Sequence, residues 1–247
     1  MSVVIITKNE QERLPRLLRS IVSQDYKDYE IIVSDAHSTD RTRQIAKRFG
    51  CRVVDGGLPS AGRNRGAAAA KGKLLLFLDA DSMLSHAFLR DSVSEFDKRG
   101  LACATAPYAP ISLRVADKAI MAFANSWCRG MQYLMPNCSG VCVFCRRDDW
   151  KAVGGFPEEF LLNEDHEFVK RVARKQGKFR VLHSRPVYVD MRRFEKEGRL
   201  HVIAKYMKIS AGYLLKNDKS KPTQDYVLHG ETRSVTELYK ERASGGS

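Results

Sequence analysis

Short apolar runs alternate with helical patterns through the first hundred residues of this 247-residue chain. The strand-like runs are VVIIT at 3–7, EIIVSD at 30–35, CRVVD at 51–55 and LLLFLDAD at 74–81. Helical patterns follow them at about 10–23, from 38–40 onward, through 62–72 and from about 85. Alternation of this kind predicts an α/β fold, a mostly parallel sheet with helices on both faces. Ligands of such sheets bind at the carboxyl ends of the strands.

The composition predicts a folded chain with an anionic partner. Apolar residues make up 43% and charged residues 29%, which is ordinary for a globular protein. The formal net charge of +13 fits nucleic acid, an acidic lipid surface or a phosphate-rich ligand. Because no zinc finger, helix-turn-helix or aromatic RNA-binding signature occurs, we expect no nucleic acid partner.

The six cysteines are scattered along the chain, which fits a reducing cytoplasm. Cys142 and Cys145 form a CxxC, yet they lie in the strand-like run GVCVFCR, where positions three apart point to opposite faces. We therefore expect both to be structural rather than zinc ligands. No apolar run of about 18 residues occurs, so we expect no transmembrane helix in this sequence.

Two carboxylates stand at the end of the most apolar strand-like run. Asp79 and Asp81 follow LLLFL and are separated by one small residue. Alternation along a strand places both carboxylates on the same side, where they can share a divalent cation. A hard cation bound by few carboxylates keeps coordination positions for phosphate oxygens. The alternative, a surface loop with two solvated acids, is disfavoured by the position after a buried strand.

The sequence resembles the family 2 glycosyltransferases of the GT-A fold, from residue 3 to about residue 193. The motifs that carry the resemblance are VVIITKNE, SDAHSTD, AGRNRGAAAAKG and FLDAD, in that order. The resemblance implies a nucleoside-diphosphate-sugar donor, inversion at the anomeric carbon, and Mg²⁺ or Mn²⁺ at the two aspartates. It also implies that Asp81 ligates the metal directly, while Asp79 faces the ribose or reaches the metal indirectly.

The resemblance further implies a set of nucleotide-binding residues. Thr7, Glu10 and Asp35 match the positions around the nucleobase and ribose, with Arg63 beside them. A carboxylate can accept a hydrogen bond from a uracil or guanine ring N–H, and an arginine can neutralise diphosphate or brace that carboxylate. The chain reads DAH at 35–37, where the family commonly has two acids and a glycine. This departure leaves the base open between UDP and GDP.

A second pair of acids lies in the run VGGFPEEFLLNEDHEFVKR. Its two adjacent glycines permit a tight turn, and Glu164 and Asp165 open an apolar-periodic helix. Acids at a helix N-terminus are a usual capping arrangement and by themselves need no catalytic role. By the resemblance, however, this is the acid pair of the acceptor site. Asp165 is then the expected general base for an acceptor hydroxyl, and Glu164 is the reserve candidate.

Basic residues and a histidine offer further candidates. Arg192 and Arg193 occupy the place where related enzymes carry a basic motif near the donor diphosphate, although a solvated basic face is the alternative. His183 is a candidate third metal ligand, as in some other enzymes of this fold, and the alternative is a structural histidine.

The segment 192–216 is predicted to form a basic amphipathic helix. Its apolar positions are Leu200, Ile203, Met207, Ala211 and Leu214. Basic residues around an apolar stripe describe a helix that can lie on an anionic membrane face. The chain would then be peripheral on the cytoplasmic face of a membrane. The alternative is an ordinary helix packed on the domain with a charged outer side.

We expect one GT-A domain with a small acceptor-side lobe. Residues 1–106 would form its nucleotide-sugar-binding half and 107–191 its acceptor-side half. The basic helix 192–216 and a polar, flexible tail at 217–247 would follow. The acceptor-side half should contain an amphipathic helix with an apolar stripe made of Ile120, Phe123, Trp127, Met131 and Leu134.

The expected reaction moves a sugar from a UDP or GDP sugar to a glycan, a polyprenyl phosphate or a lipid-linked glycan. One alternative is a nucleotidyltransferase, but such enzymes normally begin with a glycine-rich basic loop, which VVIITKNEQERL lacks. Another alternative is a catalytically inactive GT-A-like module that binds a membrane or nucleic acid through its positive charge.

Overall fold

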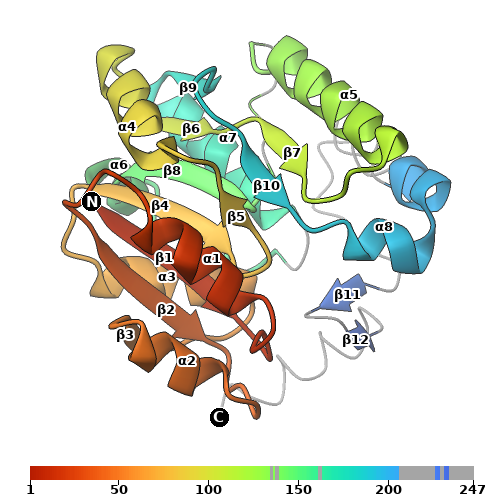
Figure 1. The fold of residues 1–247 in the computed structure, drawn as a ribbon. Coiled ribbons are helices and arrows are strands. Elements are labelled where there is room, and N and C mark those ends of the chain that lie inside the picture. Colours follow the sequence, from red (N-terminus) through yellow and green to blue (C-terminus); the bar gives the residue numbers. More distant parts are fainter. Residues whose placement is uncertain (134–135, 137–138, 161–162, 206–225, 229–230, 234–247) are drawn as a thin grey trace. The chain divides into compact units, whose positions relative to one another are not determined.

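The computed structural model describes residues 1–133, 136, 139–160, 163–205, 226–228 and 231–233 (Figure 1). These residues belong to two compact units. The first unit takes in 1–158 and 163–191, with the segment 161–162 outside the described residues. The second takes in the described parts of 159–162 and 192–247. Each unit is described by itself.

A seven-stranded sheet forms the centre of the first unit, in the order β3-β2-β1-β4-β8-β6-β9. Its strands are β1 Ser2–Thr7, β2 Glu30–Asp35, β3 Arg52–Asp55, β4 Leu74–Asp79, β6 Cys103–Thr105, β8 Cys142–Arg146 and β9 Phe179–Val181. Within this sheet only β8 is antiparallel to its two neighbours, and the other strands run in one direction. The predicted mostly parallel sheet is therefore confirmed.

Helices cover both faces of this sheet (Figure 1). They are α1 Leu14–Val22, α2 Thr42–Arg48, α3 Pro59–Ala69, α4 Phe88–Lys98, α5 Val115–Met131, α6 Arg147–Ala152 and α7 Glu164–Gln176. On one face Phe168 of α7 stacks at 4.0 Å on Phe156, which meets Phe77 of β4 edge to face at 4.9 Å. On the other face Phe88 of α4 lies 6.0 Å from Phe144 of β8. Alternate residues along the strands therefore pack into hydrophobic cores on opposite faces of the sheet.

The register of the central strands determines where the polar motifs lie. Thr7 of β1 pairs with Asp35 of β2, and Ile6 of β1 pairs with Asp79 of β4. The carboxyl ends of these three parallel strands therefore share one edge of the sheet. Helix α3 packs closely against the same strands because Gly66 has no side chain, and a Cβ there would overlap Val4 of β1.

A smaller sheet adjoins α5. It has the order β5-β10-β7, with β5 Met83–Leu84, β7 Tyr108–Pro110 and β10 Val187–Val189. Along the predicted apolar stripe of α5, Phe123 is 56% exposed, and Ile120, Trp127 and Met131 are half-buried. Leu134 lies outside the described residues. The side of α5 that is buried instead holds Asp117 and Met121.

The second unit departs from the single basic helix expected at 192–216. Helix α8 ends after Arg192–Glu197, because Gly198 adopts a left-handed φ of 85°. Helical backbone resumes at 199–205, and 206–216 lie outside the described residues. The region expected as a flexible tail contains two antiparallel strands, β11 Tyr226–Leu228 and β12 Glu231–Arg233. In the described ranges, no helix has the length and apolar character needed to cross a membrane.

Candidate functional site

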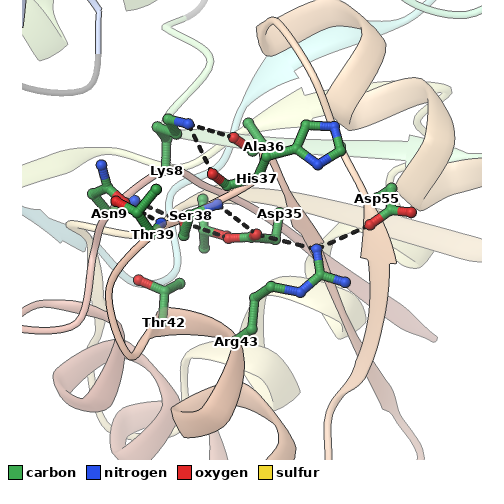
Figure 2. Close-up of polar contacts among 12 residues, drawn as sticks. Lys8, Asn9, Asp35, Ala36, His37, Ser38, Thr39, Thr42, Arg43 and Asp55 are labelled. Carbon is green, nitrogen blue, oxygen red and sulfur yellow. Dashed lines mark hydrogen bonds and ion pairs between the residues drawn. The ribbon is translucent and has the colours of Figure 1, made fainter.

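Asp35, at the end of β2, is completely buried and surrounded by hydrogen-bond donors (Figure 2). Its Oδ2 accepts from the Thr7 hydroxyl at 2.8 Å and from the Ser38 hydroxyl at 2.5 Å. Its Oδ1 accepts from the Ser38 backbone N–H at 2.9 Å and lies 3.3 Å from an Arg43 nitrogen. A carboxylate offers about four acceptor positions, so these contacts occupy Asp35 fully. Its expected contact with a nucleobase requires one of these donors to be replaced.

The loops after β1 and β2 are tied together around Asp35. The Lys8 ammonium donates to the carbonyls of Ala36 and His37 at 2.8 and 2.9 Å (Figure 2). The Asn9 side-chain oxygen accepts from the Thr39 backbone N–H at 2.9 Å. Asn9 and His37 both adopt left-handed backbone, with φ of 53° and 55°. Lys8 and Asn9 were not predicted as site residues, although both stand in the first sequence motif.

Glu10 sits where α1 begins. Its side chain is buried, and its Oε2 lies 3.6 Å from Arg13. Its backbone N–H donates to the Thr42 hydroxyl at 2.8 Å, while its carbonyl accepts from the N–H of Leu14 at 2.9 Å. Glu10 therefore joins α1 to the start of α2, beside the loops that surround Asp35. Its expected role at the nucleobase or ribose stays a prediction.

Arg63 of α3 joins three segments that are distant in the sequence, and its expected place beside the nucleotide stays a prediction. One guanidinium nitrogen donates to Glu164 Oε1 at 2.8 Å, and another donates to Asp79 Oδ1 at 3.0 Å and to the Gly140 carbonyl at 3.4 Å. Only 4% of its side chain is exposed. A Cβ at Gly140 would overlap this guanidinium, so the close approach requires glycine. Arg63 therefore links Asp79, at the end of β4, to Glu164, at the start of α7.

Asp165 completes this group, which we name the acid cluster: Asp79, Glu164 and Asp165 around Arg63. Its Oδ2 accepts from the Gly140 backbone N–H, and its Oδ1 accepts from the His166 N–H at 2.8 Å. Burial is the main cause that raises the pKa of Glu164, to about 7, and repulsion from Asp165 adds to it.

Charge is not balanced inside the acid cluster. Burial raises the pKa of Asp79 as well, and the favourable effect of Arg63 does not cancel it. Burial opposes the charge on Arg63, but the surrounding carboxylates raise the pKa of its guanidinium above the ordinary value. Carboxylates that share a single guanidinium carry more negative charge than it can offset.

Asp81 lies in the turn that follows β4. Its side chain is half-buried, and its carbonyl accepts from Arg16 at 2.9 Å. The turn is closed by Ser82, whose hydroxyl and N–H donate to the Asp79 carbonyl at 2.7 and 3.1 Å. The Asp79 side chain keeps 29% of its surface exposed beside its bond to Arg63. The expected roles of the two motif acids at the metal and the ribose stay predictions.

The structure does not bring His183 to Asp79 and Asp81. The His183 side chain is exposed, and its backbone N–H donates to the two carboxylate oxygens of Glu95 on α4, at 3.0 and 2.9 Å. Over the ranges that the structure describes, no group of three or more His, Cys, Asp or Glu residues gathers as a metal centre. A metal at Asp79 and Asp81 would need its remaining ligands from the substrate.

Arg192 and Arg193 belong to the second unit. The Arg193 Nε donates to Glu197 Oε1 at 3.0 Å, one turn along α8. The contact of either arginine with a donor diphosphate stays a prediction.

Cys142 and Cys145 are both buried in β8, and burial raises the pKa of the Cys142 thiol to about 12.

The mostly parallel sheet, with paired carboxylates after β4 and a second acid pair at the start of α7, defines a protein of the GT-A glycosyltransferase fold. The sequence model described as "Glycosyl transferase family 2" matches residues 2–151, more than half of the chain. The chain belongs to this family.

Solved structures with the same fold support this assignment. The chain matches Staphylococcus aureus TarS, determined in complex with UDP-GlcNAc, with a TM-score of 0.63 and 22% identity, over 76% of this chain and 58% of that one. It matches the mannosyltransferase PcManGT of Pyrobaculum calidifontis, determined with GDP-Man and Mn²⁺, with a TM-score of 0.61 and 17% identity, over the whole chain and 75% of that one. At these identities the likeness shows the fold.

One curated relative is a GalNAc(5)-diNAcBac-PP-undecaprenol beta-1,3-glucosyltransferase of Campylobacter jejuni, 36% identical over 94 residues. The match covers 34% of this chain and 30% of that enzyme. The chain spans less than two thirds of the length of the curated relatives that it matches.

Proposed function

We propose that this chain is a glycosyltransferase that moves a sugar from a UDP or GDP sugar to an acceptor hydroxyl or phosphate. The observation that carries the proposal is the acid cluster. In it, Arg63 joins Asp79, from the donor-side motif, to Glu164, from the acceptor-side motif. Membership of the family and the nucleotide-sugar complexes of TarS and PcManGT support the reaction class.

A divalent cation fits the donor side of this site. Hard oxygen donors suit Mg²⁺ or Mn²⁺, and the carboxylates of Asp79 and Asp81 stand together at the turn that follows β4. Asp81 would hold the metal directly, and Asp79 would face the ribose or reach the metal indirectly. When bound, the metal would stabilise negative charge on the departing diphosphate. The PcManGT complex contains Mn²⁺ together with GDP-Man, which supports this choice.

The two acids at the start of α7 suit different roles. Glu164 is bound to Arg63 and has a raised pKa, so it suits a positioning role that holds the guanidinium. Asp165 accepts its hydrogen bonds from backbone N–H groups. A general base takes the proton from the acceptor hydroxyl, and the carboxylate of Asp165 is held in place by the backbone rather than by Arg63. We therefore assign Asp165 as the general base, on the side opposite the leaving diphosphate, which gives inversion.

The proposed acceptor is a glycan or a lipid-linked phosphate or glycan, with the enzyme peripheral on a membrane. The Campylobacter relative is named for an undecaprenol-linked substrate, which supports a lipid-linked acceptor here. The positive charge of the chain suits a surface of anionic lipid. The nucleotidyltransferase and the inactive binding module remain the alternatives that the experiment below must separate.

The test is nucleoside diphosphate release. The full chain is incubated with a panel of UDP and GDP sugars, with water as the acceptor, and separately with nucleoside triphosphates plus sugar 1-phosphates, each with Mn²⁺ or with EDTA. We expect Mn²⁺-dependent release of UDP or GDP from one sugar nucleotide. We also expect thermal stabilisation by that donor, about 2.7 kcal/mol at a concentration one hundred times its Kd.

Asp81→Ala is the matched variant, and it should lose the metal-dependent part of both signals because the remaining acid cannot hold a dication against water. Release of pyrophosphate from triphosphates would indicate the nucleotidyltransferase instead. Stabilisation by a donor without any turnover would indicate the inactive module.

A further inference from the structure

Helix α5 of the first unit presents large apolar side chains to solvent. Leu113 is 87% exposed, Val115 81%, Phe123 56% and Tyr133 70%. All four lie on α5 or within two residues of its ends, and we name them the α5 outer face. Single exposed apolar residues are normal on a protein surface, but a group of them on one element marks an interaction site. Figure 1 shows α5 beside β7, at the margin of its unit.

The inner side of α5 is polar, and its hydrogen bonds set the orientation of the helix. The Asn125 side chain accepts from the Tyr108 N–H and donates to the Tyr108 carbonyl, both at 2.8 Å. The Gln132 side-chain oxygen accepts from the Val181 N–H at 2.9 Å. Asp117, on the same side, is fully buried. Because polar groups hold this side against β7 and β9, the apolar residues are directed outward.

The exposed charged residues of the stretch 111–133 have one sign. Between residues 111 and 133 the only acidic residue is Asp117, which is buried. Arg114 and Lys118 are exposed on the same stretch. Apolar side chains with cations beside them and no exposed carboxylate in the same stretch are typical of a helix that lies in the interface of an anionic membrane. A neutral or basic protein partner would not offer this charge complementarity.

We propose that the α5 outer face binds an anionic lipid surface, with Phe123, Leu113 and Val115 entering the boundary between headgroups and acyl chains. This assigns membrane contact to α5 rather than to the segment 192–216. The proposal rests on the proposed function in one respect: lipid binding by α5 would bring the glycosyltransferase site to a lipid-linked acceptor. Binding to lipid needs no turnover, so the two proposals can fail separately.

The test is co-sedimentation of the full chain with vesicles of phosphatidylcholine alone or with phosphatidylglycerol added. We expect binding only to the vesicles that contain phosphatidylglycerol. Phe123→Ser should lower the partition coefficient about tenfold or more, because burial of that ring is lost. Lys118→Gln should lower it roughly fivefold, through the loss of one cation at the surface.

Val22→Ser is the matched control, since Val22 of α1 is 47% exposed but has no place in the α5 outer face. It should bind vesicles as the wild type does. Thermal melting and donor stabilisation establish that each variant folds and keeps its nucleotide site. The proposal is overturned if the wild type ignores anionic vesicles, or if Phe123→Ser binds like Val22→Ser. It is also overturned if only Arg192 and Arg193 substitutions abolish binding, or if Phe123→Ser merely dissociates a wild-type dimer.

Discussion

Replacing Arg63 with methionine tests the acid cluster directly. The Arg63 side chain is 4% exposed and gives charged hydrogen bonds of 2.8 Å to Glu164 and 3.0 Å to Asp79. Methionine keeps much of the side-chain volume but leaves both carboxylates without their shared cation. Removing one partner of a buried ion pair costs about 3–5 kcal/mol, because an uncompensated charge remains. We expect Arg63→Met to lose about that much free energy of unfolding at pH 7, in EDTA.

The loss should depend on pH in a defined direction. Without Arg63 the pKa values of Asp79 and Glu164 rise further, and each unit of that rise corresponds to about 1.4 kcal/mol. At pH 5 the buried carboxyls of the variant take up protons and the repulsion is relieved. The destabilisation measured by urea unfolding should therefore be smaller at pH 5 than at pH 7.

Arg90→Met provides the control for this measurement. Arg90 also pairs with two carboxylates, Asp25 and Asp91, but its side chain is 56% exposed and solvent screens the pairs. Its unfolding curve should lie close to that of the wild type. Equal stability losses in the Arg63 and Arg90 variants would refute the reasoning, and so would a larger loss for Arg63→Met at pH 5 than at pH 7.

Two further substitutions test neighbouring parts of the account. Burial raises the pKa of Glu164 to about 7, so the stability that its protonated form provides is complete below about pH 4.5 and is lost as pH rises through about 7. Glu164→Gln should flatten the fall in unfolding free energy between those pH values, and an unchanged pH profile would contradict the assignment. Asp35→Ala leaves the donors of Thr7 and Ser38 without their acceptor, which should weaken nucleoside diphosphate binding in EDTA by about 1–3 kcal/mol. Calorimetric titration that gives equal affinities would show that Asp35 does not shape the nucleotide site.

The sequence alone predicts the central sheet well. The runs that become β1, β2 and β4 are short, apolar and bounded by polar motifs, and this pattern predicts buried strands. The acids after β4 and at the start of α7 are visible as motifs for the same reason. Their positions at strand and helix ends follow from local pattern.

The position of Arg63 could not be predicted in this way. Its hydrogen bond to Glu164 joins residues 101 positions apart, and only the tertiary fold brings α3 to the start of α7. The orientation of α5 could not be predicted either. Periodicity identifies an apolar stripe on the helix, but it does not show that Asn125 and Gln132 find backbone partners that set how the helix packs. Gly198 likewise interrupts a helix whose apolar pattern runs through it.

The central claim is that Asp165 removes a proton from the acceptor in a site that binds the donor independently. The most direct measurement compares kcat and donor Kd of Asp165→Asn with those of the wild type, once product analysis has identified a hydroxyl acceptor. The amide keeps the shape of the side chain but cannot accept the proton, so kcat should fall about 100-fold or more while donor Kd stays unchanged. Near-normal kcat with a confirmed hydroxyl acceptor would contradict the assignment of Asp165 as the base.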